Sequence, residues 1–231
     1  MRTFKAITFD FWGTLVDVDT SGEAGVAAVL AQSGVTPGMT AKELYFKWDD
    51  ATVRRYRSGT WRPYFDFALL GLQDVLQPLG FDAGPERWAA LTETLLSTMT
   101  GEARPHPEVP AIIAVLKEKY PLMPITNMDN RLFDLNPFRS EFAQVTTAEE
   151  ARAFKPSAFI FQRAIEKLGV PADQILHVSL SQFADLEGAM PMGMQVAWIN
   201  RYGHPLGQFT PKPLYEFSDL SGLKGVLAGD W

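Results

Sequence analysis

The sequence predicts an α/β protein, a Rossmann-like parallel sheet with helices on both faces and an inserted α-helical segment. After residue 104, short apolar runs typical of buried strands alternate with helical patterns, which indicates βαβ units. Residues 18–103 show helical periodicity and no clear strand. The 231 residues suit one α/β core that carries a smaller inserted domain.

The first predicted strand covers residues 5–10, and Gly13-Thr14 ends it. Later strands are expected at 122–126, 175–178 and 196–199, with helices at 109–119, 156–168 and 185–190. Pro156 suits the first turn of its helix, where a backbone N–H is not needed.

We expect the core to comprise residues 1–17 and 104–231, and the helical cap domain to comprise residues 18–103. Hinges are expected near 15–20 and 101–107, where Pro105 and Pro107 mark a boundary. Within the insertion, apolar residues such as Trp88, Leu91 and Leu95 recur at three- and four-residue steps. The insertion interrupts the chain just after the first strand, so it should cover the functional edge of the sheet as a lid.

Composition excludes several classes of protein. Hydrophobic residues make up 46% and charged residues 21%, as in globular proteins. A net charge of −6 and a pI near 5.1 argue against nucleic acid as a partner, but not against a small anionic organic substrate. The absence of cysteine excludes disulfides and thiol catalysis. No stretch approaches 18 apolar residues and no signal-peptide core is present, so we expect a cytoplasmic protein without membrane contact.

Polar residues follow the predicted strands. Asp10 ends the first strand, Thr126 and Asn127 end the second, Lys155 precedes a helix and Asp185 follows a later strand. Because ligands of parallel sheets bind beyond the carboxyl ends of the strands, these side chains should converge.

The residue types suit nucleophilic catalysis on an anionic substrate. An ionised, oriented carboxylate at Asp10 is a nucleophile, and Lys155 would keep its pKa low. The Thr126 hydroxyl and the backbone N–H groups of Phe11 and Trp12 can donate hydrogen bonds to the substrate.

Four stretches in order strengthen this interpretation. They are Ile7-Thr-Phe-Asp10-Phe-Trp-Gly-Thr14, Pro124-Ile-Thr126-Asn127, Phe154-Lys155-Pro156, and His177-Val-Ser-Leu-Ser181-Gln-Phe-Ala-Asp185. Together they resemble the four motifs of the haloacid dehalogenase superfamily over about residues 3–203. The resemblance implies catalytic roles for Asp10, Lys155 and Asp185, and substrate binding by Phe11, Trp12, Thr14, Thr126, Asn127 and Ser181.

Two departures from that family pattern refine the function. Phosphatases of the superfamily carry a second Asp two residues after the nucleophile and an acid at the start of the fourth motif; here these positions hold Trp12 and Leu180. The 2-haloacid dehalogenase subgroup resembles this chain at both points and uses neither metal nor other cofactor. The resemblance therefore implies that Asp10 expels halide and forms an ester, which water activated by Asp185 then cleaves.

Two alternatives stay open. One is a phosphatase with weak Mg²⁺ dependence, the metal being held by Asp10 and Asp185. The other is a non-catalytic member that binds a small anion.

The dehalogenase subgroup also uses a cap arginine for the halide, and Arg54, Arg55, Arg57 and Arg62 are candidates. Exposed cap aromatics could support a homodimer. His106, His177 and His204 are interpreted as structural or uninformative, since their spacing suits no metal site.

Overall fold

A computed structural model of the chain describes residues 4–227. The ends of the predicted core, residues 1–3 and 228–231, lie outside the described residues. The chain divides into two units. Unit 1 contains residues up to Val16 together with Pro105–Asn127 and the chain from Ser140 onward, and unit 2 contains Asp17–Arg104 and Met128–Arg139.

Unit 1 is built on a six-stranded parallel sheet in the order β5-β4-β1-β6-β7-β8. The strands are β1 (Ala6–Phe9), β4 (Leu122–Thr126), β5 (Thr146–Thr147), β6 (Ile175–Ser179), β7 (Gln195–Ile199) and β8 (Tyr215–Phe217). Every residue of β1, β4 and β6 is buried, as expected of apolar strands covered on both faces. The parallel sheet and its main strands confirm the predicted fold class.

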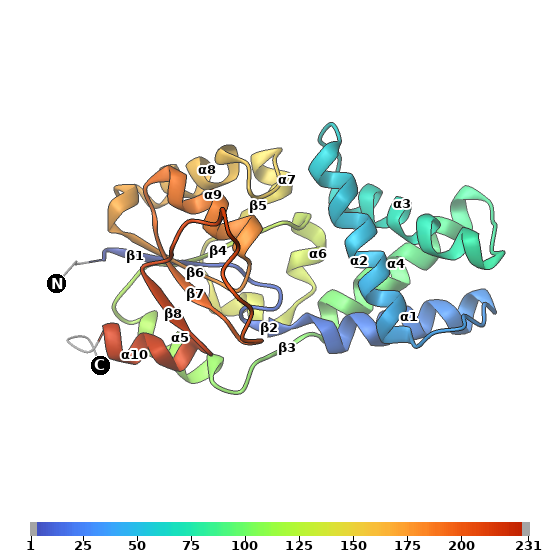
Figure 1. Cartoon of the computed structure of the whole chain (residues 1–231), viewed down its shortest axis with the longest axis horizontal. Helices are drawn as coiled ribbons and strands as arrows, with labels where there is room; N and C mark the ends of the chain where they lie inside the picture. The colour runs from blue at the N-terminus through green and yellow to red at the C-terminus, as the bar shows by residue number, and fades with distance from the viewer. Residues whose placement is uncertain (1–3, 228–231) are drawn as a thin grey trace. The chain divides into compact units, whose positions relative to one another are not determined.

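Helices cover both faces of this sheet. The helices α7 (Ala148–Ala151), α8 (Ala158–Leu168) and α9 (Glu187–Ala189) lie on one face, and α5 (Val109–Leu116) and α10 (Leu223–Val226) lie on the other (Figure 1). Short 3₁₀ turns occur at Ala172–Gln174, Met190–Met192 and Leu220–Gly222. This is the doubly wound arrangement in which sites form at the carboxyl edge of the sheet.

Two predicted helices differ in detail. The helix expected to start at Pro156 begins at Ala158, because Ser157 caps it by accepting a hydrogen bond from Phe159 N. The helix expected over 185–190 is three short pieces: a single-turn π-helix η4 (Gln182–Leu186), then α9, then a 3₁₀ turn. Single π turns are rare and occur often at functional sites.

Unit 2 contains four longer helices, α1 (Val18–Ser33), α2 (Ala41–Ser58), α3 (Tyr64–Leu76) and α4 (Pro85–Glu102), with a 3₁₀ turn at Gln77–Leu79. Helix α1 packs on α2 and α4, and α3 packs on the same two helices (Figure 1). The predicted apolar row of α4, from Trp88 to Met99, is buried. Gly34 ends α1 in the left-handed conformation, and Thr40 and Glu43 form a capping box at the start of α2.

Unit 2 also includes a segment that follows the second motif, Met128–Arg139, with the short helix α6 (Asn130–Asp134) and the start of a 3₁₀ turn at Pro137–Glu141. The Asp129 carboxylate accepts hydrogen bonds from the first two backbone N–H groups of α3 at 2.7 and 2.9 Å. Arg131 forms a two-point ion pair with Glu93 of α4. Buried Asn136 donates to two carbonyls near the end of α4. The sequence led us to expect this segment in the core; the predicted boundaries of core and cap stay predictions.

Where the chain passes between the units, β2 (Val16–Asp17) and β3 (Arg104–Pro105) pair as a two-stranded sheet. These two crossings, at 16/17 and 104/105, fall in the ranges predicted for the hinges; the chain also crosses at 127/128 and 139/140. Among residues 4–227, no helix is long and apolar enough to cross a membrane.

Candidate active site

Strand order brings the ends of the three central strands of unit 1 together. Strand β1 lies between β4 and β6, with Phe9 in register with Pro124 on one side and Val178 on the other. The residues that follow or end these strands, Asp10, Thr126 and Ser179, therefore lie at one edge of the sheet. This is the edge at which the sequence predicts a site.

At this edge a buried ammonium pairs with two buried carboxylates. Lys155 Nζ lies 2.7 Å from Asp10 Oδ1 and 2.9 Å from Asp185 Oδ1. The Lys155 and Asp185 side chains are 2% and 0% exposed, and that of Asp10 is 11% exposed. The two predicted catalytic carboxylates thus share one lysine, and Asp10 is the more accessible of the two.

Burial and charge shift these groups in different directions. Burial raises the pKa of Asp10 above its ordinary value; Lys155 opposes this effect and Asp185 adds to it. For Asp185 the charge of Lys155 and the hydrogen bond from His177 outweigh burial and hold the pKa at about 2. Burial lowers the pKa of Lys155, but the two carboxylates outweigh burial and raise it. Lys155 alone therefore does not keep the Asp10 pKa low, contrary to the expectation from the sequence, because burial has the larger effect.

Thr14 fixes the second oxygen of Asp10. Its hydroxyl donates to Asp10 Oδ2 at 2.7 Å and accepts from Leu180 N at 2.9 Å. The carboxylate is therefore held at both oxygens, by Lys155 and by Thr14. This contact gives Thr14 an orienting role, and its predicted contact with substrate stays a prediction.

Thr126 ends β4 with a buried hydroxyl that has no hydrogen-bond partner among the described residues. An unsatisfied buried hydroxyl costs about 1–3 kcal/mol. Thr126 lies at the edge of the sheet where the site is predicted, and its contact with substrate stays a prediction.

Asn127 holds the backbone of Lys155. Its side-chain oxygen accepts from Lys155 N at 2.6 Å, and its amide donates to Lys155 O at 3.3 Å. The peptide bond from Lys155 to Pro156 is cis. Asn127 thus places the lysine, while its predicted contact with substrate is untested.

The fourth-motif loop is held by its own serines. Ser179 Oγ donates to Asp185 Oδ2 at 2.8 Å and accepts from Ser181 N at 3.0 Å. Ser181 Oγ accepts from Ala184 N and so caps η4. The predicted binding role of Ser181 stays a prediction. Ser179 contacts Asp185 directly, and it was quoted within the motif without a role.

Sequence reasoning also missed His177. Its Nε2 lies 2.8 Å from Asp185 Oδ1 and its Nδ1 lies 2.8 Å from Thr8 Oγ1. A signal was present, because a polar ring stands in an otherwise apolar strand that ends just before the fourth-motif loop.

Phe11 and Trp12 begin the loop after the nucleophile. The Phe11 ring is buried and meets the Trp12 ring edge-on at 4.9 Å. The Phe11 carbonyl accepts from Leu15 N and Val16 N. Substrate binding through the N–H groups of Phe11 and Trp12 stays a prediction.

The residues of this edge do not fit a Mg²⁺ site. Trp12 and Leu180 supply no carboxylate where phosphatases have one, and Asp10 and Asp185 both pair with Lys155. Among residues 4–227 no cluster of three or more His, Cys, Asp or Glu could hold a metal. Mg²⁺ prefers octahedral oxygen coordination with one or two carboxylates.

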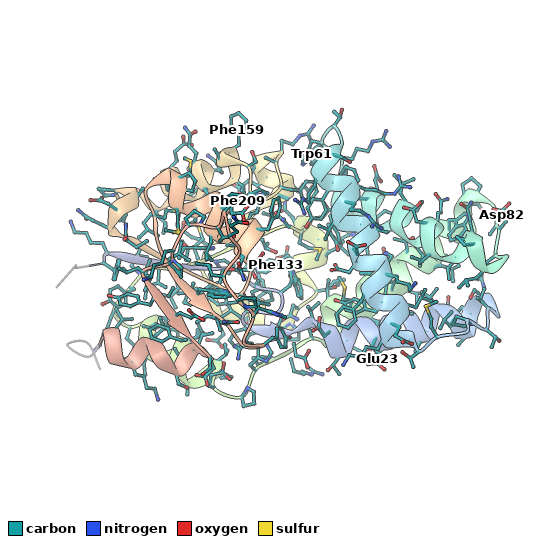
Figure 2. All side chains as sticks on the ribbon, in the orientation of Figure 1. Glu23, Trp61, Asp82, Phe133, Phe159 and Phe209 are labelled. Atoms are coloured by element: carbon teal, nitrogen blue, oxygen red, sulfur yellow. The ribbon has the colours of Figure 1, made fainter. Side chains whose placement is uncertain are left out.

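The candidate halide-binding arginines lie in unit 2. Arg54 pairs with Asp50 at 2.8 Å, and Arg55 forms a two-point pair with Asp74. Arg62 lines a pocket of about 440 Å³ near the end of α2, next to Trp61, which Figure 2 labels. Arg54 and Arg55 are therefore paired with carboxylates of unit 2.

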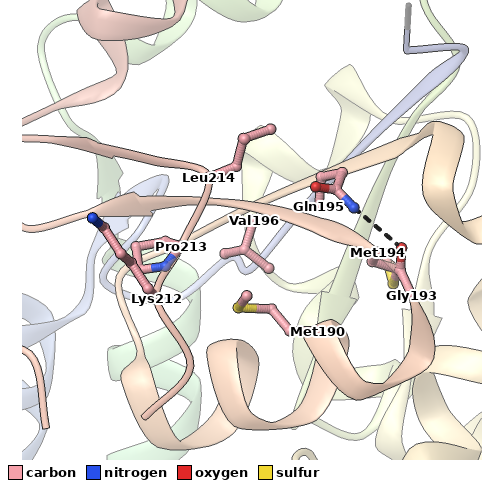
Figure 3. Close-up of a pocket in the computed structure, with 8 residues that line it drawn as sticks. All are labelled: Met190, Gly193, Met194, Gln195, Val196, Lys212, Pro213 and Leu214. Carbon is pink, nitrogen blue, oxygen red and sulfur yellow. Dashed lines mark hydrogen bonds between the residues drawn. The ribbon is translucent and has the colours of Figure 1, made fainter. Parts of the chain in front are cut away.

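A separate pocket of about 310 Å³ in unit 1 is lined by residues including Met190, Val196 and Lys212 (Figure 3). It lies beside the amino-terminal end of β7, whereas Asp10 follows the carboxyl-terminal end of β1. Since the strands are parallel, this pocket is not the candidate active site.

The doubly wound parallel sheet, the Asp–Lys–Asp cluster at its edge and the inserted helical segment are those of a Rossmann-like hydrolase with a carboxylate nucleophile. The family model described as "haloacid dehalogenase-like hydrolase" matches residues 4–189, and the chain belongs to this family.

Individual relatives give a finer comparison. The (S)-2-haloacid dehalogenase H-109 of Pseudomonas putida is 26% identical over 100% of this chain and 99% of its own length. An L-2-haloacid dehalogenase from Xanthobacter autotrophicus, solved with chloropropionic acid covalently bound, shares the fold with a TM-score of 0.82 at 20% identity, covering 98% and 99% of the two chains. The 5-amino-6-(5-phospho-D-ribitylamino)uracil phosphatase YigB of Escherichia coli is 34% identical, but over 48% of this chain and 46% of its own.

Proposed function

We propose that this protein hydrolyses the carbon–halogen bond of a small 2-haloacid through an ester on Asp10, without a metal ion. The observation that carries the proposal is the Lys155 ammonium between the Asp10 and Asp185 carboxylates, at a site where Trp12 and Leu180 replace the acids of phosphatases. The full-length similarity to a 2-haloacid dehalogenase supports the same substrate class.

In the first step a carboxylate oxygen of Asp10 attacks the carbon that bears the halogen. A C–O bond forms, the C–halogen bond breaks, and its electron pair leaves with the halide. Lys155 and Thr14 hold the two oxygens of Asp10 and so restrict its rotation. A halide needs no proton to leave, which is consistent with an indole in place of a general acid at position 12.

In the second step water attacks the ester carbonyl carbon of Asp10. The Lys155 ammonium, within hydrogen-bond reach of Asp10 Oδ1, stabilises the oxyanion that forms there. Collapse breaks the bond between the Asp10 carbonyl carbon and the oxygen that attacked the substrate. That oxygen takes up a proton and leaves as the hydroxyl of the 2-hydroxyacid, and Asp10 regains its carboxylate with the oxygen of water. One halide and one proton are released for each water consumed.

Asp185 is our candidate base for that water. Its Oδ1 already receives Lys155 and His177, while Oδ2 receives one hydrogen bond, from Ser179. Oδ2 is therefore the oxygen with room for a proton. Complete burial and a pKa near 2 also suit a second role, in which Asp185 holds Lys155 in place.

Substrate recognition would combine the Thr126 hydroxyl and the N–H groups of Phe11 and Trp12 around the substrate carboxylate. The net negative charge of the chain does not prevent the binding of such a small anion. A nearby cation attracts it more strongly than distant carboxylates repel it, because charges are screened beyond a Debye length of about 8 Å. A cytoplasmic location and a homodimer complete the proposal, with neither nucleic acid nor membrane as a partner.

The second candidate function is phosphate ester hydrolysis. Its support is the 34% identity of about half of this chain to the phosphatase YigB. An alkoxide leaving group would then need a proton that Trp12 cannot supply, so this reaction requires a different acid.

The test is halide release from fluoroacetate, chloroacetate and both enantiomers of 2-chloropropionate, in the presence of EDTA. We expect release that EDTA does not reduce and that Asp10→Asn abolishes, whereas Asp173→Asn, at an exposed Asp of the same unit, keeps it. Intact-protein mass spectrometry of rapidly quenched enzyme should show the ester. No halide from any substrate, together with Mg²⁺-dependent phosphate release, would establish the second candidate instead.

A further inference from the structure

His177 is a buried imidazole whose two nitrogens both have partners. It lies in β6, is 0% exposed, and is in register with Thr8 of β1 and Val196 of β7. Its Nε2 contacts Asp185 Oδ1 and its Nδ1 contacts Thr8 Oγ1, each at 2.8 Å. Phe161 of α8 meets the ring edge-on, with centroids 5.8 Å apart and planes at 87°. The ring is therefore fixed on each side.

The partners assign the tautomer of this ring. An ionised carboxylate only accepts hydrogen bonds, so His177 Nε2 carries the proton that it donates to Asp185. If the ring is neutral, Nδ1 is the acceptor and the Thr8 hydroxyl donates to it. Thr8 thus selects the tautomer that the carboxylate needs.

The hydrogen bonds continue from His177 to the candidate nucleophile. Asp185 Oδ1 accepts from both His177 Nε2 and Lys155 Nζ, and the same ammonium reaches Asp10 Oδ1. Both carboxylates compete for this one ammonium. The more negative charge that His177 and Ser179 stabilise on Asp185, the less Asp185 draws on Lys155.

We propose that His177 is a positioning residue that shares Asp185 with Lys155 and so leaves the ammonium available to Asp10. The proposal deepens the proposed function, on which its kinetic test rests. A structural histidine would fill the same space between Thr8 and Phe161. The two roles differ in one consequence: loss of a purely structural histidine would not selectively change the ionisation of Asp10.

The variants separate shape from hydrogen bonding. His177→Phe keeps a ring against Phe161 and removes the donor, whereas His177→Gln keeps an N–H donor. Thr8→Val removes the hydroxyl that selects the tautomer. Thr146→Val is its matched control: a buried Thr of the same sheet, bonded to Met123 and not to this chain of groups.

The first readout is the pH dependence of halide release in a single turnover. A hydrogen bond to a charged group is equivalent to about one to two pK units. Because His177 acts on Asp10 only through Asp185 and Lys155, we expect a smaller effect: His177→Phe should raise the apparent pKa of the acid limb by about half a unit to one unit. That is a loss of about 3- to 10-fold below the limb and little loss at high pH. His177→Gln should restore most of the shift, Thr8→Val should give a smaller one, and Thr146→Val none.

A uniform loss of rate at every pH, with the acid limb unmoved in His177→Phe, would overturn the proposal. So would failure of His177→Gln to differ from His177→Phe when both variants fold, as judged by their circular dichroism.

The second readout needs no substrate. Nitrogen-15 NMR of the imidazoles should show His177 protonated at Nε2 and bare at Nδ1; the chain has three histidines, so single substitutions assign the signals. Carboxyl carbon-13 NMR should show Asp10 titrating at higher pH in His177→Phe than in the unaltered protein. If the unaltered protein releases no halide, the proposed function fails, and these spectra decide the role of His177 alone. Protonation at Nδ1, or an unchanged Asp10 titration, contradicts the proposal.

Discussion

Removing the shared ammonium of the site is a direct test of its electrostatics. Lys155→Met keeps a long side chain but leaves the Asp10 and Asp185 carboxylates buried without the cation that lies 2.7 and 2.9 Å from them. Removing one partner of a buried ion pair typically costs about 3–5 kcal/mol. We expect unit 1 to lose stability by about that amount at pH 8.

The loss should depend on pH with a definite sign. In the variant, Asp10 lacks the charge that opposes burial, so its folded pKa rises further above its unfolded value. Such a carboxyl destabilises the fold while it is ionised. The destabilisation is therefore largest above the raised pKa and disappears as pH falls toward the ordinary Asp value. At pH 5 we expect a smaller loss than at pH 8.

Hydrogen exchange measured by mass spectrometry is the suitable assay, because peptides from β1 and β6 report on unit 1 separately from the helices of unit 2. Lys117→Met is the matched control, since Lys117 pairs with Glu141 while 47% exposed, and exposed pairs contribute about 0–1 kcal/mol. A loss for Lys155→Met no larger than that of Lys117→Met at pH 8, or one that is the same at pH 5, would refute the electrostatic account.

Three further outcomes are expected. Asn127→Ala removes both hydrogen bonds to the Lys155 backbone and should cost unit 1 about 1–3 kcal/mol in urea unfolding, with a lower kcat; unchanged values would show that the Lys155 backbone does not depend on Asn127. Asp185→Asn should give one rapid equivalent of halide and little turnover if Asp185 is the base, but a slow first equivalent if it mainly holds Lys155; rapid-quench assays separate the two. Burial, with Asp19 and Asp50, raises the pKa of Asp49 to about 6, so the ionised group weakens unit 2 increasingly from about pH 4 to above pH 6. Asp49→Asn should therefore increase the free energy of unfolding of unit 2 by about 1–3 kcal/mol at pH 8 and leave it unchanged at pH 4. Melting temperatures at the two pH values measure this.

The sequence predicts the sheet well because β1, β4 and β6 are short apolar runs followed by polar residues, a pattern that the parallel fold requires. The proximity of Asp10 and Asp185 was also predictable, since each follows a strand that ends at the same edge of the sheet. Lys155 follows no strand directly, and the third motif was the signal for it. The predicted helix start at Pro156 was wrong by two residues, because the Ser157 side chain caps the helix and the first helical residue is Ala158.

Other features depend on partners that spacing does not reveal. His177 has the sequence context of a packed strand residue, and its role requires both Thr8 and Asp185, which lie 169 and 8 residues away along the chain. Asn127 resembles a ligand-binding residue until its bonds to the Lys155 backbone are seen. The raised pKa of Asp10 reflects a balance of burial against Lys155, which no pattern of residues can weigh.

The assignment of Met128–Arg139 to unit 2 affects any attempt to transplant the helical insertion between members of the family. An exchange limited to Asp17–Arg104 would bring in a new α3 and α4 but keep the old residues Asp129, Arg131 and Asn136, whose bonds are to those helices. The recipient would then hold mismatched halves of one packed unit. A chimera that exchanges both stretches keeps these bonds within a single parent, and the first of its two splice points around Met128–Arg139 directly follows Asn127, which holds the Lys155 backbone.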